Sequence, residues 1–105
     1  MFNKEREIEL VNVLTTYDSI GQPMPYETKT TVIAKIRSIS MSEWTNANQL
    51  GLSAEYQAVI WSNEYERQEF ANIDGVRYHI YRTYEVGDKV ELYLERMVGY
   101  DSIGR

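Results

Sequence analysis

The stretch QEFANIDGVRYHIYRTY, residues 68–84, constrains the fold more than any other part of this 105-residue chain. Asp74 and Gly75 stand between two runs in which apolar and polar residues alternate. A two-residue β-hairpin loop needs positive φ at its centre, and Asp-Gly is one of the pairs that adopt it readily. The pattern therefore predicts two antiparallel strands joined at Asp74 and Gly75.

Four further segments have the composition or the alternation that is typical of strands. They are residues 7–16, 28–40, 55–62 and 89–98. The segment YDSIGQPMPYE, residues 17–27, has two prolines and a glycine and is predicted as the loop of a hairpin, and Gly87-Asp88 marks a further turn.

The middle of the chain changes period, because three apolar residues recur at a spacing of three: Trp44, Ala47 and Leu50. This predicts a short helix over residues 43–50, with Ser42 as its N-cap and Gly51 at its end. We therefore expect a mainly β protein: a small antiparallel β-barrel or sandwich of about six strands, with one short helix inserted mid-chain. Residues 1–105 are expected to form a single domain.

Core positions follow from the alternation of the last two strands. Val90, Leu92 and Leu94 share one face, and we expect them to pack against Val76, Tyr78 and Ile80. Arg82 lies between apolar neighbours, where an unpaired guanidinium is costly. We expect it to pair with a carboxylate from another strand, Glu91 first and Glu69 second, or else to extend to solvent.

Composition narrows the classes of function. Eleven Lys and Arg against sixteen Asp and Glu give a net charge of −5, which disfavours nucleic-acid binding. Cysteine is absent, so disulfides and thiolate sites are excluded. The charged start MFNKEREIEL does not resemble a signal peptide, and no apolar run has membrane length. We expect a soluble, intracellular product without a membrane partner.

Catalytic signatures are missing from the sequence. The single histidine, His79, lies on a predicted strand without a second histidine or a cysteine to complete a metal site. There is no glycine-rich phosphate loop and no nucleophile elbow. We expect no catalytic residue, no metal and no cofactor, and therefore a protein that is not an enzyme.

The pentapeptide YDSIG occurs twice, at residues 17–21 and 100–104. The flanking residues do not match, so the two copies do not mark an internal repeat. Asp and Ser bond to nearby backbone and Gly accepts positive φ, so both copies are predicted as turns.

The order of motifs resembles a known family. EIELVNVLTTYDSIGQ, SISMSEWTNANQLGLSAEYQAVIW and IDGVRYHIYRTYEVGDKVELYLERMVG are similar to the opening, middle and closing stretches of phage head-tail connector proteins, the head-closure or stopper proteins of long-tailed phages. The resemblance covers nearly the whole chain, and its most specific parts are Tyr78-x-Ile80-x-Arg82-Thr83-Tyr84 and Glu91-Leu92-Tyr93.

The resemblance implies a structural virion protein that completes the connector below the portal, helps to retain packaged DNA and offers a docking surface to the tail. Such proteins are monomers when free and form rings, commonly twelve-fold, in the particle. A portal or adaptor ring binds on the head side and a tail-completion protein on the tail side. Genomic DNA passes the channel without specific binding. The expected location is the virion, and the host cytoplasm during assembly.

Interface residues are expected in the segments that are not needed to close the barrel. In the resembling family the mid-chain insertion reaches toward the channel and the termini engage neighbouring rings. We therefore expect residues 41–52 and 99–105 to be mobile in the free protein and to become ordered on assembly. The candidate interface residues are Trp44, Asn46, Asn48, Gln49, Leu50, Tyr84, Tyr100 and Asp101.

A second function stays open. A small OB-like barrel binds single-stranded nucleic acid or a sugar through aromatic platforms, for which the candidates are Tyr78, Tyr81, Tyr84 and Tyr93. The acidic charge opposes the nucleic-acid version, and a salt-titrated binding assay separates the two functions.

Overall fold

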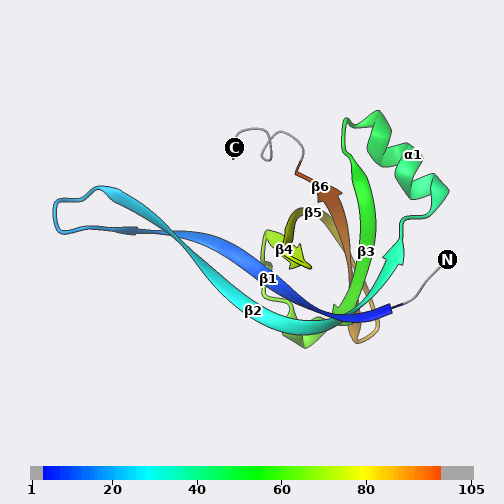
Figure 1. Cartoon of the computed structure of the whole chain (residues 1–105), viewed down its shortest axis with the longest axis horizontal. Coiled ribbons are helices and arrows are strands. Elements are labelled where there is room, and N and C mark those ends of the chain that lie inside the picture. Colours follow the sequence, from blue (N-terminus) through cyan, green and yellow to red (C-terminus); the bar gives the residue numbers. More distant parts are fainter. Residues whose placement is uncertain (1–3, 98–105) are drawn as a thin grey trace.

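The computed structural model describes residues 4–97 and shows a closed barrel of antiparallel strands with one helix beside it (Figure 1). The strands are β1 (Lys4–Tyr17), β2 (Pro23–Ser38), β3 (Ala54–Trp61), β4 (Phe70–Ile73), β5 (Val76–Val86) and β6 (Lys89–Arg96). The helix α1 (Met41–Gln49) lies between β2 and β3, and a short 3₁₀ turn, η1 (Ser62–Glu64), follows β3. The predicted fold class is confirmed.

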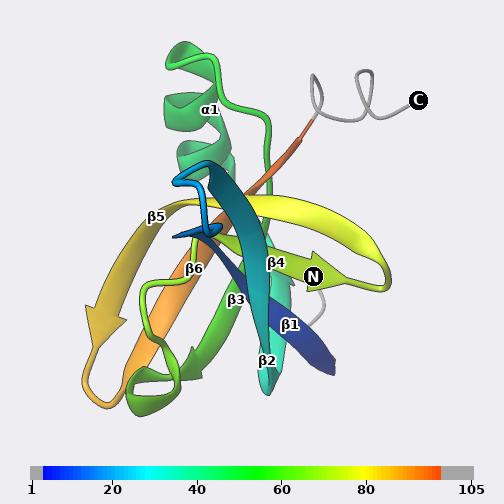
Figure 2. The ribbon, with the colours of Figure 1, turned by 90° about the vertical axis from the view of Figure 1, so that its left-hand side faces the viewer.

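Two three-stranded meanders make the barrel, β1-β2-β3 and β4-β5-β6, and the order around it is β1-β2-β3-β6-β5-β4. The meanders join antiparallel where β3 pairs with β6 and where β1 pairs with β4 (Figure 2). The predicted hairpin is confirmed, because Ile73 pairs with Val76 and the two residues between them have φ of 52° at Asp74 and 79° at Gly75.

The core is the set of inward-facing residues that the alternation predicts. Val90, Leu92 and Leu94 are fully buried, and Tyr78 and Ile80 pack with them. The prediction for Val76 is wrong, since this side chain is 47% exposed. Val76 is the first residue after the β4–β5 turn, so it lies where the barrel ends and no strand covers it. The rest of the core cluster comprises Ile8, Leu10, Val32, Ala34, Ile36, Ala58, Ile60, Ala71 and Ile73.

The first hairpin loop is shorter than the sequence predicts. β2 already begins at Pro23, which pairs with Tyr17, so only residues 18–22 form the turn. Prolines are tolerated in this part of β2 because β3 pairs only with Lys35–Ser38 and leaves the other edge open. The first YDSIG is indeed a turn: the Asp18 side chain accepts hydrogen bonds from the backbone N–H groups of Ile20 and Gln22. The second copy lies outside the described residues.

The helix begins earlier than predicted. Ser40, not Ser42, is the N-cap, because Ser40 has extended backbone and its hydroxyl accepts a hydrogen bond from the N–H of Glu43 at 3.2 Å. The end is as predicted, with Gly51 at φ +80° just after the C-cap. Of the predicted apolar face only Ala47 is buried, whereas Leu50 is 77% exposed. The helix therefore has little apolar contact with the barrel.

Candidate interaction surfaces

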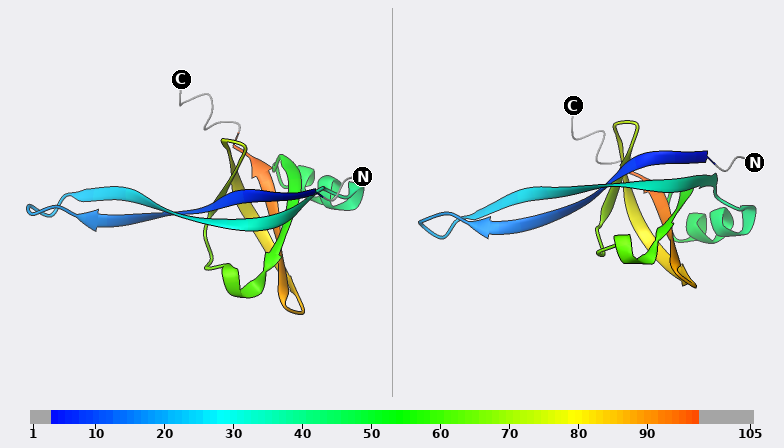
Figure 3. Two further views of the ribbon diagram at one scale, coloured as in Figure 1. Left: turned by 60° about the horizontal axis from the view of Figure 1, so that its bottom comes forward. Right: turned by 90° about the horizontal axis from the view of Figure 1, so that it is seen from below.

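The outer half of the β1–β2 hairpin projects from the barrel as a free two-stranded ribbon, which we call the arm (residues 13–26) (Figures 1 and 3). The described molecule measures 51 × 31 × 22 Å, and the arm extends it along its longest axis. Within the described chain, no third strand pairs with the arm. An isolated two-stranded hairpin is marginally stable in water at best, so the arm lacks the support that the other strands receive.

The base of the arm is fixed to the barrel. The Arg77 guanidinium of β5 makes two hydrogen bonds to the Glu27 carboxylate, at 2.7 and 2.9 Å, in the bidentate geometry that gives direction as well as strength. Arg77 also donates to Asn72, whose amide donates to Glu9. These contacts tie β2, β5, β4 and β1 together where the arm leaves the barrel.

The surface of the arm is apolar and nearly uncharged. Asp18 is the single charged residue of the segment 13–26. Leu14 lies opposite Tyr26 and continues the inward-facing parity of Ile8 and Leu10 beyond the barrel. The exposed apolar side chains of the arm are Val13, Leu14, Tyr17, Ile20, Met24 and Tyr26. These side chains lie on both faces of the ribbon, since Leu14 pairs with Tyr26 and Tyr17 pairs with Pro23 in the alternating register. Large exposed apolar side chains gathered on one segment are typical of a protein–protein contact.

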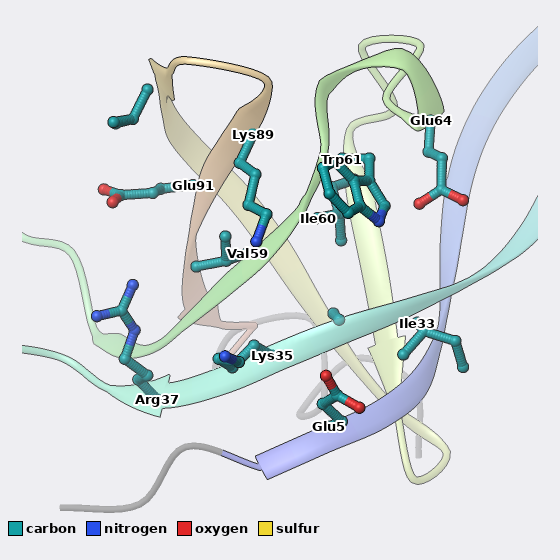
Figure 4. A pocket seen from close by; sticks show the side chains of 12 residues that line it. Glu5, Ile33, Lys35, Arg37, Val59, Ile60, Trp61, Glu64, Lys89 and Glu91 are labelled. Carbon is teal, nitrogen blue, oxygen red and sulfur yellow. The ribbon is translucent and has the colours of Figure 1, made fainter.

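A second candidate surface is a hollow of about 500 Å³ on the outside of the barrel wall, over β2, β3 and β6, which we call the outer pocket (Figure 4). Trp61, Ile33 and Val86 line it and are each about half exposed. Its other lining residues include Val59, the cations Lys35, Arg37 and Lys89, and the acids Glu5, Glu64 and Glu91. The Lys89 ammonium lies 4.7 Å from the centre of the Trp61 ring, so one face of the indole is engaged in a cation–π contact.

Helix α1 is held to the barrel by a polar contact that the sequence did not reveal. The Glu43 carboxylate accepts from the Arg82 guanidinium at 2.6 Å and from the Tyr81 hydroxyl at 2.7 Å. The Arg82 guanidinium lies over the Tyr93 ring, 4.1 Å from its centre. The expected partners of Arg82, Glu91 and Glu69, are therefore wrong; the Glu91 carboxylate accepts instead from the Tyr93 hydroxyl.

A β-bulge explains this correction. The pairing of β5 with β6 slips between Ile80, which faces Leu94, and Arg82, which faces Tyr93. Without the extra residue Arg82 would share the inward parity of Ile80 and enter the core. The bulge turns it outward, beneath α1, where Glu43 neutralises it.

The contact favours the ionised form of Glu43 and the neutral form of Tyr81. The hydrogen bond from Arg82, assisted by that from Tyr81, holds the pKa of Glu43 below its ordinary value against the opposing effect of burial. Burial and the adjacent Glu43 carboxylate raise the pKa of the Tyr81 hydroxyl. The contact is therefore an ionised carboxylate between a cation and a neutral phenol over a wide range of pH.

Removing the Glu43 charge should loosen the helix and leave the barrel intact. Because hydrogen bonds to a charged group are worth about 1.5–3 kcal/mol, Glu43→Gln should raise amide exchange in residues 41–49 by about tenfold or more.

The lowered pKa of Glu43 sets the direction of the pH dependence. The contact is fully formed above the unfolded-state pKa of about 4.3 and is lost as the pH falls through the folded-state value.

Acrylamide quenching of Trp44 in a Trp61→Phe background reports this loss. A step on acidification should appear when Glu43 is present and be absent from the Glu43→Gln variant. Equal exchange of residues 41–49 in both proteins would show that the carboxylate does not hold the helix. The expected ordering of residues 41–52 on assembly stays a prediction.

The sequence-predicted interface residues are placed as follows. Trp44, Asn46, Asn48, Gln49 and Leu50 are exposed on α1 or at its end, and Tyr84 is exposed on β5 opposite Glu91. Tyr100 and Asp101 lie outside the described residues. Asp74 and Gly75 lie in the β4–β5 turn with positive φ, and Leu92 is fully buried.

The aromatic platform expected of an OB-like binding site is not assembled. Tyr78 is buried in the core, Tyr93 is covered by Arg82, and the Tyr81 hydroxyl is bonded to Glu43. Of the four candidates, only Tyr84 is more than half exposed.

Residues that could suggest chemistry have structural partners. The His79 imidazole lies 2.7 Å from the Glu95 carboxylate on the neighbouring strand and beside the Phe70 ring. In residues 4–97 no three or more His, Asp or Glu side chains gather as metal ligands. Over the same range, no helix has the length and apolarity needed to cross a membrane.

Comparison with protein-family models, with curated proteins and with solved structures found no match to this chain.

Proposed function

We propose that this protein is a structural component of a phage head–tail connector, which forms a ring below the portal. The observation that carries the proposal is the arm: an apolar ribbon, clamped at its base by Glu27 and Arg77, with no partner in its own described chain. Such a ribbon gains stability when another surface covers it. A ring of copies supplies that surface, since each copy then offers an arm to its neighbour.

Charge and composition support the same role. The net charge of −5 disfavours a grip on DNA, which suits a channel through which packaged DNA passes without specific binding. The exposed residues of α1 and Tyr84 offer further surface to a portal or adaptor ring on the head side and a tail-completion protein on the tail side. The protein then acts in the virion and, during assembly, in the host cytoplasm.

Co-expression with the products of the adjacent genes tests the proposal. We expect the purified chain alone to sediment as a monomer, and the co-expressed chain to co-purify in rings that negative-stain images resolve, commonly twelve-fold. A chain that stays monomeric and binds none of these products would overturn the proposed function.

A further inference from the structure

We propose that the outer pocket is the docking site for the tip of the arm (residues 17–22) of a second copy of this chain. The inference rests on the proposed function and deepens it, because it assigns the two surfaces that meet between neighbours in the ring. Both surfaces are present on every copy, and each exposes side chains that are ordinarily covered.

Apolar side chains are exposed both at the tip of the arm and in the outer pocket. Tyr17 is 66% exposed and Ile20 is 76% exposed, and both belong to the tip. Ile33, Trp61 and Val86 of the outer pocket are also exposed, around a hollow of about 500 Å³, a volume within the usual range of binding pockets. Burying the tip in the pocket removes both sets from water.

The pocket also contains cations that can bind the single charge of the arm. Asp18 is the one charge of the arm, and its Oδ1 already accepts two backbone N–H groups, which keeps the turn in shape. A carboxylate has about four acceptor sites, so Asp18 can accept further hydrogen bonds. Lys35, Arg37 and Lys89 line the pocket. The pocket lining also holds three acids, and Glu5 is the cross-strand partner of Lys35, so the three cations lie among carboxylates (Figure 4). Asp18 of the tip adds one anion, for which Lys35, Arg37 and Lys89 are the available cations.

The occupant must come from another copy. Tyr17 pairs with Pro23 at the tip, whereas Ile33 of the pocket pairs with Glu7, ten residues further back along β1. At about 3.3 Å per strand residue the tip lies about 33 Å from that position, on a ribbon that points away from the barrel (Figure 1). A contact between two different surfaces is heterologous, so it repeats from copy to copy and closes into a ring or continues as a filament.

The absence of cysteine from the chain permits a direct cross-linking test. The test variant is Ile20→Cys/Val86→Cys, with one thiol at the tip and one in the pocket. The matched control is Ile20→Cys/Val76→Cys, because Val76 is also on β5 and is 47% exposed, against 49% for Val86, but lies outside the pocket. Each full-length protein is treated with a short bis-maleimide, both at high concentration alone and after co-expression with the adjacent gene products.

We expect the test variant to give a ladder of covalent multimers, at least about tenfold more abundant than in the control. A mixture of the two single-cysteine proteins should give dimers and no ladder, as a heterologous contact requires. Lys89→Glu in the test variant should reduce the ladder. Dimers from Ile20→Cys alone, through a contact between two tips, would overturn the proposal, as would equal ladders in test and control.

The outcome separates this inference from the proposed function. Rings without a ladder would overturn the docking of tip into pocket and leave the connector role standing. A ladder without rings or bound partners would support the docking and overturn the connector role.

Discussion

Replacing Leu92 with alanine is expected to lower the free energy of unfolding by about 2–5 kcal/mol, a large fraction of the stability of a domain of this size. Leu92 is fully buried in β6, which pairs with β3 on one side and β5 on the other. The barrel is closed, so the walls around the site cannot collapse freely into the cavity. Chemical denaturation monitored by circular dichroism measures the loss.

Leu50→Ala is the matched control, because it removes the same atoms from a side chain that is 77% exposed. Its effect should stay within about 0.5 kcal/mol. If Leu92→Ala were as mild as Leu50→Ala, the register of β6 would have to differ by one residue, which would exchange its inner and outer faces.

The strands were predictable because burial on one face of a sheet leaves a period of two in the sequence. Val90, Leu92 and Leu94 follow that rule, and the positive φ at Asp74 and Gly75 follows from the residue types. The bulge before Arg82 was not predictable, since one extra residue shifts the parity without changing the composition of the strand. Because of that shift, Arg82 pairs with Glu43 of the helix and not with a carboxylate on a strand.

The arm was missed for a different reason. Alternation shows which residues of β1 share a face, but it does not show where the neighbouring strands stop. Leu14 continues the parity of Ile8 and Leu10, and this was a readable sign that β1 runs on. β4 pairs only with Glu9–Val11 of β1, however. Residues of this parity are therefore buried near the contact, as Ile8 and Leu10 are, and exposed beyond it, as Leu14 is. The outer pocket could not be predicted either, because Trp61 of β3, Ile33 of β2 and Val86 of β5 line one hollow only in the folded barrel.

Shortening the arm should abolish assembly while the barrel stays folded. Leu14 and Tyr26 pair directly, so residues 15–25 can be replaced by Asn-Gly, which closes a two-residue hairpin. The clamp between Glu27 and Arg77 is retained. None of the residues removed is buried, so the free energy of unfolding should change by less than about 1 kcal/mol, and the shorter loop acts in the favourable direction. Ring formation and co-purification with the adjacent gene products should both be lost.

A full-length variant separates the length of the arm from its chemistry. Tyr17→Ser/Ile20→Ser keeps the paired backbone of β1 and β2 but removes the two most exposed apolar side chains of the tip. It should also fail to assemble, because the contact depends on burying these side chains. Sedimentation velocity and negative-stain imaging measure assembly, and denaturation measures the barrel. Normal rings from the shortened chain would exclude the arm as the interface. A loss of more than about 2 kcal/mol in barrel stability would instead make the arm part of the fold, since only mechanisms such as core disruption reach that size.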